Sequence, residues 1–309
     1  MLGRKCLAFG YTIRYGDSWY DQSKPTAMII VAPSDTDTGV VQPLPLPPSK
    51  PAAAWHDLVE GAAKSWIWAA LALQDIKLRY RGSVLGPFWL TISMLVMAGA
   101  MGLIYPRLFA IDAKTYLPYL IIGLVVWQFI SGLVTEGCDT FLRAQSVIQQ
   151  IPMPFSIHVY RTVCRNLLVL AHSFVVIPIG LIIFRLAVDW RIVETAAGLA
   201  LLALNGVWIS ILLGMLSARF RDIPPIVANF MQIGFFITPI FWPIDALGDW
   251  KPIAALNPLF AAIDAVRAPL LGVAVSETSW IVLLFTTVLG CGMTFALFAR
   301  FRTRIAYWI

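Results

Sequence analysis

Three basic side chains at helical spacing form the clearest candidate for a chemical site in this chain. Arg161, Arg165 and His172 fall on one face of a helix, and Glu136 ends the apolar run that precedes them. Charge within an apolar helix is costly, so such groups usually face a partner or a cavity. Two interpretations stay open: the arginines pair with Glu136, or they contact an anionic lipid headgroup at an inner gate. The candidates for that contact are Arg79, Arg81, Arg161, Arg165 and His172.

Patterns typical of catalysis are weak. The three histidines form no HExxH motif, and the four cysteines have neither metal-site nor redox spacing. Asp35-Thr36-Asp37 matches the DxD of metal-dependent glycosyltransferases but follows no predicted strand. Gly61–Ser65 resembles the end of a phosphate-binding loop without its two-glycine frame. We therefore expect that this chain is not an enzyme, holds no metal or cofactor, and binds no ATP by itself.

The composition indicates a membrane protein. The 309 residues are 59% hydrophobic and only 13% charged, against roughly 25% charged in soluble domains. Several apolar runs reach the roughly 20 residues that a membrane-spanning helix needs. The predicted fold class is an all-α polytopic membrane protein. We assign the net charge of +6 to cytoplasmic lysines and arginines rather than to nucleic-acid binding.

Three regions are predicted along the chain. Residues 1–54 are a polar, proline-rich tail expected to be disordered. Residues 55–82 combine an amphipathic helix, expected to lie in the membrane interface with Trp55 and Trp66 on its buried face, with a basic cluster. Residues 83–309 form the membrane domain.

Six spans are predicted in that domain, and twelve flanking Lys and Arg residues on one side against six on the other favour cytoplasmic termini. Residues 244–272 are apolar but interrupted by prolines, so we expect two short re-entrant helices there. Gly206, Ser210 and Gly214 form a small-residue ridge, for either intrachain packing or a subunit interface. The predicted spans are Pro87–Tyr105, Leu117–Gly137, Val163–Phe184, Ile192–Ser217, Pro224–Pro243 and Ser279–Ala299.

The segment DIKLRYRGSVLGPFW (Asp75–Trp89) resembles the motif at which ABC-2-type polysaccharide export permeases enter the membrane. RFRD (Arg219–Asp222), TPIFWP (Thr238–Pro243) and LNPL (Leu256–Leu259) fit the same family. The resemblance implies a homodimer in the cytoplasmic membrane. It also implies a separate ATPase subunit that binds ATP and magnesium, and a glycan carried on a polyprenyl-pyrophosphate lipid. Alternatives are an ABC-2 exporter of drugs or small lipids, and a membrane-integral glycosyltransferase.

Three further sets of residues complete the predicted transporter. A sugar chain needs a polar or aromatic path, since rings contact apolar CH faces without burying charge; the alternative for these rings is a lipid-facing belt. The channel-lining candidates are Trp89, Trp127, Phe236, Phe241 and Trp242, and the outer-gate candidates are Asn257 and Pro258. A short helix between spans two and three should contact the ATPase. The contact candidates are Arg143, Gln145, Val147, Arg219, Arg221 and Asp222.

Overall fold

The computed structural model describes residues 12–13, 30–31, 49–84, 86, 88–185 and 190–309. It divides into two units, Met1–Ser49 and Lys50–Ile309. In the first unit, β1 (Thr12–Ile13) pairs antiparallel with β2 (Ile30–Val31). The Asp35-Thr36-Asp37 motif and the proline-rich run before Ser49 lie outside the described residues. Helix α1 begins at Lys50, so the last residues that the sequence assigns to the tail are helical.

The apolar runs of the second unit form long helices, and five are long and apolar enough to cross a membrane, or six if one bent pair is counted as a span. The protein is therefore an all-α polytopic membrane protein. The long helices are α3 (Phe88–Phe109), α4 (Ala113–Cys138), α6 (Ser156–Phe174) continued by α7 (Val176–Ile183), α8 (Ile192–Arg219) and α12 (Glu277–Phe301). A short 3₁₀ turn, η2 (Arg302–Arg304), and α13 (Ile305–Trp308) follow α12.

Helix α4 supplies more of the core than any other described helix, packing against α3, α6, α8, α9 (Ile223–Ile237) and α11 (Pro258–Leu270). The small residues on α8 allow its close approach to α4. A Cβ on Gly206 would lie 2.7 Å from Leu133, and one on Gly137 would lie 3.2 Å from the Cα of Ser210. The ridge therefore serves intrachain packing, one of the two interpretations of the sequence.

Helix α9 is short for a span. Its 15 residues extend about 22 Å, less than the roughly 30 Å of a hydrocarbon core. It begins with prolines at its first positions and gives way at Thr238 to the non-helical segment 238–243. The helix therefore ends before the predicted span does, because Pro239 and Pro243 cannot donate helical hydrogen bonds.

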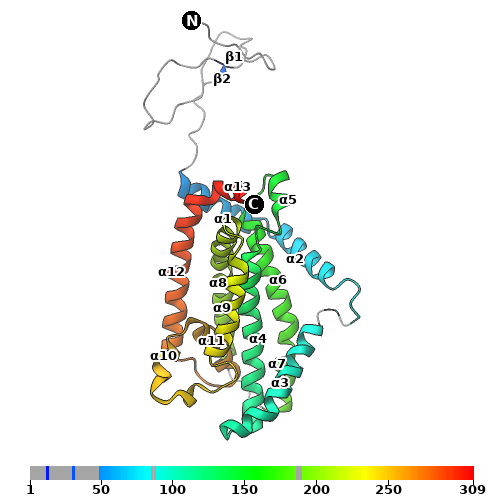
Figure 1. Ribbon diagram of the computed structural model, residues 1–309, viewed down its shortest axis with the longest axis vertical. Helices are drawn as coiled ribbons and strands as arrows, with labels where there is room; N and C mark the ends of the chain where they lie inside the picture. The colour runs from blue at the N-terminus through cyan, green and yellow to red at the C-terminus, as the bar shows by residue number, and fades with distance from the viewer. Residues whose placement is uncertain (1–11, 14–29, 32–48, 85, 87, 186–189) are drawn as a thin grey trace. The chain divides into compact units, whose positions relative to one another are not determined.

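The interrupted segment that follows bends sharply. The 3₁₀ turn η1 (Ile244–Trp250) and α10 (Lys251–Ala255) meet α11 at 113°. Figure 1 shows α10 and α11 together at the end of the bundle opposite α5 (Gln145–Gln150), from which α12 returns to the α5 end. Two short helices before the last span were predicted here, and this arrangement matches them.

The amphipathic segment differs from its prediction in that it is divided into α1 (Lys50–Ala63) and α2 (Ser65–Arg79) by a break at Lys64. Trp55 and Trp66 are exposed on the protein surface, and their position in the membrane interface stays a prediction. Asp57 of α1 is fully buried, because it accepts hydrogen bonds from the backbone N–H groups of Phe155 and Ser156 at the start of α6.

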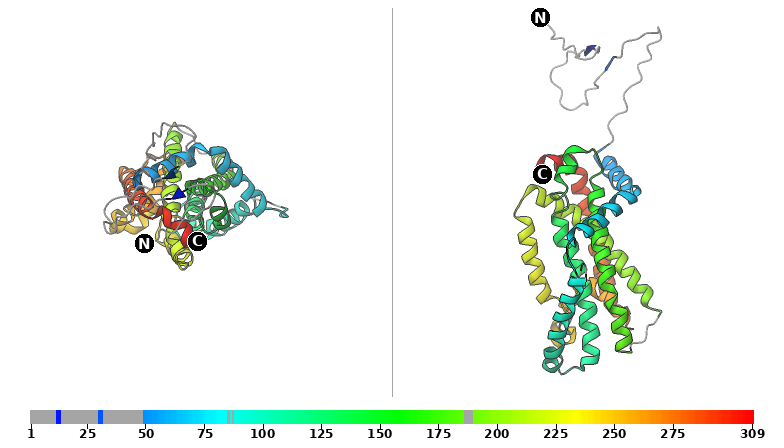
Figure 2. Two further views of the ribbon diagram at one scale, coloured as in Figure 1. Left: turned by 90° about the horizontal axis from the view of Figure 1, so that it is seen from above. Right: turned by 90° about the vertical axis from the view of Figure 1, so that its right-hand side faces the viewer.

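Both ends of the second unit lie at the same end of the bundle. Figures 1 and 2 show α1, α5 and the C-terminal α13 together there. Gln149 of α5 donates to the backbone carbonyl of Ile309 at 3.2 Å, and Arg302 contacts Asp57 of α1. The C-terminal residue therefore contacts α5, the short helix that the sequence predicts between two spans.

Candidate functional site

Two arginines of α6 meet an acidic residue of α2. Arg161 donates from Nε to Asp75 Oδ2 at 2.8 Å, and Arg165 donates to the same oxygen at 2.7 Å. Their long side chains reach α2 because the two helices pack side by side. Asp75 was missed as a site residue, although it opens the DIKLRYRG segment, because its partners lie 86 and 90 residues away.

A second carboxylate joins the cluster from α4. Arg165 donates from Nε and one terminal nitrogen to Glu136 Oε2 at 2.9 and 2.8 Å, and Asn166 donates to the same oxygen at 2.9 Å. Arg79 pairs with the other carboxylate oxygen. The pairing of Glu136 with an arginine, one of the two interpretations left open by the sequence, is thus formed by Arg165.

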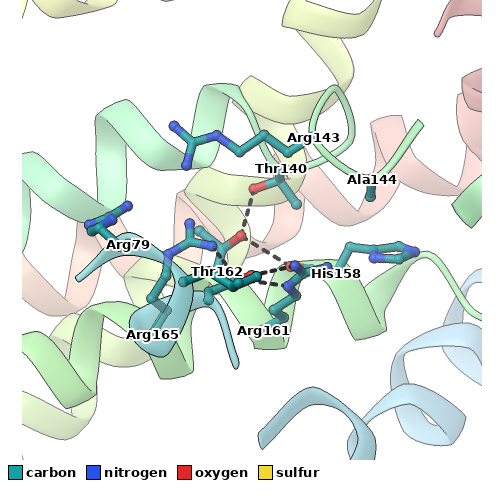
Figure 3. A pocket seen from close by; sticks show the side chains of 10 residues that line it. Arg79, Thr140, Arg143, Ala144, His158, Arg161, Thr162 and Arg165 are labelled. Carbon is teal, nitrogen blue, oxygen red and sulfur yellow. Dashed lines mark hydrogen bonds and ion pairs between the residues drawn. The ribbon is translucent and has the colours of Figure 1, made fainter. Parts of the chain in front are cut away.

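The cluster borders a polar cavity of about 340 Å³. Figure 3 shows its walls: side chains of α2 and α6, and those of Thr140 and Arg143 from the turns between α4 and α5. Hydroxyls of Thr140 and Thr162 lie 3.3 Å apart in its wall. His158 also lines it, and its Nδ1 has no hydrogen-bond partner among the described residues.

The charges around this cavity do not cancel. The guanidinium groups of Arg79, Arg161 and Arg165 face only the carboxylates of Asp75 and Glu136, which leaves one positive charge in excess. Arg143, also lining the cavity, pairs with Asp139 one helical turn away. Planar guanidinium groups bind phosphate oxygens in pairs. The arrangement can therefore hold one phosphate-like anion without breaking its internal pairs.

The two cluster residues on α2 remain ionised over the physiological range. Burial alone would raise the pKa of Asp75, but hydrogen bonds from Arg161 and Arg165 outweigh it and hold that pKa below 3.8. For Arg79, burial lowers the pKa, but the hydrogen bond and the negative charge of Glu136 raise it by more, so the pKa lies above its usual value. Protons therefore do not switch these two groups near neutral pH.

The other two residues proposed for a headgroup contact lie apart from the cavity. Arg81 is exposed in the turn after α2. His172 is seven positions beyond Arg165, roughly 10 Å along α6, and its ring packs edge-on against Phe88 at a centroid distance of 4.2 Å. Helical spacing correctly puts His172 on the same face of α6 as the two arginines. It does not show that the carboxylates of Asp75 and Glu136 reach only as far along α6 as Arg165.

A family model for the ABC-2 type transporter matches residues 68–271. The chain belongs to this family. It is 24% identical to the O-antigen export system permease protein RfbA of Klebsiella pneumoniae over 238 residues, which cover 75% of this chain and 91% of the relative. A protein of the same name from Myxococcus xanthus is 23% identical over 210 residues, covering 64% of this chain and 78% of that relative.

The family match contains the whole cavity of this ABC-2 transporter. Asp75, Glu136 and Arg165 lie inside residues 68–271, as does the bent pair η1/α10 and α11. Helices α1 and α12 lie beyond it. The matched region therefore covers the charged cavity and the bent pair, whereas the contact of Asp57 with Arg302 joins segments on either side of it.

Most of the predicted aromatic path forms one cluster. The rings of Trp127 and Phe235 are 5.7 Å apart, and Phe241 stacks on Phe235 at 5.5 Å. Phe236 packs against Phe241, and the indole of Trp242 donates to the carbonyl of Phe236 at 3.2 Å. Trp127 is almost fully buried while Phe236 is exposed. Phe235 of α9 also belongs to this cluster, although the sequence did not name it as a candidate. Its position next to Phe236 in the sequence could have identified it.

Trp89 and the outer-gate pair lie elsewhere. Trp89 is exposed at the start of α3. Asn257 caps α11 by accepting from the N–H of Leu259 at 2.9 Å, and its amide donates to Thr238 Oγ1 at 3.1 Å. The break at Asn257-Pro258 therefore contacts the residue at which α9 ends. That contact links the bent pair of η1/α10 and α11 to the end of α9. A gating role for Asn257 and Pro258 stays a prediction.

The predicted ATPase-contact residues are exposed or half-buried at one end of the bundle. Gln145 and Val147 lie on α5, and Arg219, Arg221 and Asp222 lie where α8 passes into α9. The C-terminal helix α13 contacts both α5 and α8. The guanidinium of Arg219 lies 6.0 Å from the ring centre of Trp308 on α13. The sequence did not predict that α13 connects α5 with α8, because a helix of only four residues is too short to show a periodic pattern.

Proposed function

We propose that this protein is the permease subunit of an ATP-driven exporter that moves a lipid-linked polysaccharide, such as O-antigen or capsule, across the cytoplasmic membrane. One observation carries the proposal: the family match over residues 68–271 coincides with relatives named O-antigen export permeases, matched over most of their own length. The long apolar helices support the transmembrane role.

The proposal includes an orientation and two protein partners. The α5 end faces the cytoplasm, as the excess of flanking Lys and Arg residues favours. A separate ATPase subunit docks there on α5 and on the Arg219–Asp222 turn. It binds the ATP and magnesium, and a second copy of this chain completes the path.

The charged cavity is proposed to receive the anionic headgroup of the carrier lipid. Its excess positive charge, its four arginines and its threonine hydroxyls match the oxygens of a pyrophosphate. Arg79, Arg161 and Arg165 make the contact, and the exposed Arg81 attracts the headgroup from the membrane surface. His172 is not part of this assignment, because it packs on Phe88.

Deletion of the gene tests the function. We expect lipid-linked glycans to accumulate inside the deletion strain and surface glycan to disappear, with both effects reversed by the intact chain. The tagged permease should co-purify with an ATPase subunit. A deletion strain with normal surface glycan and no internal lipid-linked glycan would overturn the proposal.

A further inference from the structure

A groove at the α5 end of the bundle lies between the last turns of α8, the end of α12 and α13. It has a volume of about 520 Å³. Its wall is apolar and is formed by Leu212, Met215 and Leu216 of α8 together with Leu297 and Phe301 of α12. The α8 positions recur at i, i+3 and i+4, so they follow one face of that helix. Both helices are long and apolar enough to cross a membrane, so the wall belongs to the membrane-spanning part of the bundle.

The charge of this groove is confined to one end. Its two charged residues are Arg219, the last residue of α8, and Arg304, the last residue of η2. Each follows an apolar wall residue, Leu212 or Leu297, by seven positions, which in a helix extend roughly 10 Å. Trp308 lines the groove as well, and indole rings are enriched at the level of lipid headgroups. The groove therefore changes from apolar to cationic toward the α5 end.

The two arginines of the groove have no acidic partner. The guanidinium of Arg219 lies 5.8 Å from the ring centre of Phe220, and that of Arg304 lies 5.9 Å from the ring centre of Phe301. Neither forms an ion pair or a side-chain hydrogen bond within the part of the chain that the structure describes. In the charged cavity, by contrast, Arg161 is paired with a carboxylate. Like charges that share a groove repel each other, and an anion between them reduces that repulsion.

An anionic phospholipid has both parts that this groove can bind. Guanidinium groups bind phosphate oxygens in pairs, and an acyl chain can cover the apolar wall. A soluble protein could contact Arg304, but it could not reach Leu212 or Leu297 within the spans. None of the described residues that line the groove carries a hydroxyl or a carboxamide, whereas threonines line the charged cavity. A phospholipid therefore fits the groove better than a protein or a pyrophosphate headgroup does.

We propose that this groove binds an anionic phospholipid of the cytoplasmic leaflet, with Arg219 and Arg304 holding its phosphate and the wall of α8 and α12 covering an acyl chain. The leaflet follows from the proposed orientation, in which the α5 end faces the cytoplasm. Helix α13 contacts both α5 and α8, so the bound lipid holds the C-terminal helix against α8 beside the predicted ATPase surface. The site is separate from the charged cavity, whose walls come from α2, α6 and the turns after α4.

Lipid binding to the full chain in detergent tests the site independently of export. The purified permease is titrated with phosphatidylglycerol and, separately, with phosphatidylcholine, and bound lipid is counted by native mass spectrometry. We expect phosphatidylglycerol to bind at least tenfold more tightly. Arg304→Gln should weaken its binding about fivefold, the contribution of one basic residue beside anionic lipid, and Arg304→Lys should restore it to within about twofold. Arg304 is used because Arg219 is also a predicted contact of the ATPase subunit.

Arg300→Gln is the matched control for Arg304→Gln. Arg300 is exposed near the end of α12, lies 5.4 Å from the ring centre of Phe301, and does not line the groove. Its removal takes away the same charge, and phosphatidylglycerol affinity should stay within about twofold of wild type. Equal weakening by the two glutamine variants would show a diffuse attraction to a basic surface and would overturn the site. Equal affinity of the wild type for the two lipids would overturn it as well.

Protection of a single cysteine locates the bound lipid. The four native cysteines are replaced by alanine, and either Leu216→Cys or Ala296→Cys is added. Both positions are exposed, but only Leu216 lines the groove. Phosphatidylglycerol should slow thiol labelling at least fivefold at 216 and less than twofold at 296, and phosphatidylcholine should slow neither. Equal protection of the two positions would contradict binding in the groove.

The same variants distinguish two other ligands. A polyprenyl phosphate that protects Leu216→Cys at lower concentration than phosphatidylglycerol would assign the groove to the carrier lipid. Loss of ATPase co-purification in Arg304→Gln, at unchanged phosphatidylglycerol affinity, would assign it to a protein contact. Either result would overturn the inference and leave the proposed function standing. Normal surface glycan in the deletion strain would instead overturn the proposed function without affecting the lipid measurements.

Discussion

Arg302 donates from Nε to Asp57 Oδ2 at 2.7 Å across 245 residues of sequence. The same carboxylate accepts from the backbone N–H groups of Phe155 and Ser156 at 3.2 and 3.0 Å, and it is fully buried. The hydroxyl of Ser156 donates in turn to the Asp57 carbonyl at 2.6 Å. One side chain thus joins α1, the start of α6 and the segment after α12.

Removing this carboxylate should destabilise the bundle strongly. Asp57→Ala leaves two backbone N–H groups and a guanidinium without their acceptor, and breaking a buried ion pair costs about 3–5 kcal/mol. We expect the apparent melting temperature in detergent to fall by roughly 6 °C or more. Arg302→Gln should cost less, because the Arg302 side chain is 28% exposed and can be hydrated.

Asp139→Ala provides the matched control for that measurement. Asp139 pairs with Arg143 at 2.9 Å on the protein surface, one helical turn away. Such pairs contribute about 0.3–0.5 kcal/mol, so the melting temperature should change by no more than about 2 °C. Equal effects of Asp57→Ala and Asp139→Ala would contradict the role of Asp57 as a junction.

The pair of Arg165 with Glu136 should show strong coupling. Arg165→Gln removes charged hydrogen bonds to both Glu136 and Asp75, and Glu136→Gln leaves three guanidinium groups facing one carboxylate; the Arg165 side chain is only 6% exposed. We expect each single variant to destabilise the protein, and the double variant to lose less than the sum, with a coupling of about 1–3 kcal/mol. Additive losses in a double-mutant cycle of melting temperatures would show that the two groups act independently.

Acid should weaken the contact between α2 and α6. Its two arginines hold the pKa of Asp75 below 3.8 in the folded protein. Because this pKa is lowered by folding, the contribution is complete well above the ordinary pKa of a carboxyl group and disappears as the pH falls through the folded value. The gap in melting temperature between wild type and Asp75→Asn should therefore be constant from pH 7 to about pH 5 and should close below pH 4. A gap that widens on acidification would contradict this sign.

The long helices were predictable because they follow from local patterns, the apolar runs. The same patterns left open whether Glu136 pairs with an arginine and which one, and they did not identify Asp57 and Asp75 as bound residues. The partners of these two carboxylates lie 99 and 90 residues further along the chain. In a helix beside a membrane, apolar side chains can face outward, so the periodicity identifies two faces without identifying which one is buried.

Helix α5 should transmit the action of the ATPase subunit. Gln145→Pro and Val147→Pro each remove a backbone N–H donor from the first turn of this six-residue helix, which lies outside the spans. The lost hydrogen bonds are those to the carbonyls of Leu142, at 3.4 Å, and Ala144, at 3.0 Å. We expect the purified complex to hydrolyse ATP while surface glycan falls at least tenfold. Gln145→Ala keeps the helix and should export normally. Normal export in both proline variants would exclude α5 as the coupling surface.

The aromatic path can be tested at its exposed members. Trp89 and Phe236 are both exposed, at 59% and 60%, so alanine at either position removes a ring without opening a cavity in the core. If the rings contact the sugar chain, Trp89→Ala or Phe236→Ala should lower surface glycan several-fold while the melting temperature changes by less than about 2 °C. Phe285→Ala is the control, since Phe285 on α12 is exposed to 66% and is not one of the predicted path residues; a lipid-facing ring there should be dispensable. Trp127→Ala should act differently, lowering stability as well, because Trp127 is buried against Phe235. Normal export in both Trp89→Ala and Phe236→Ala would assign these two rings to the lipid-facing belt.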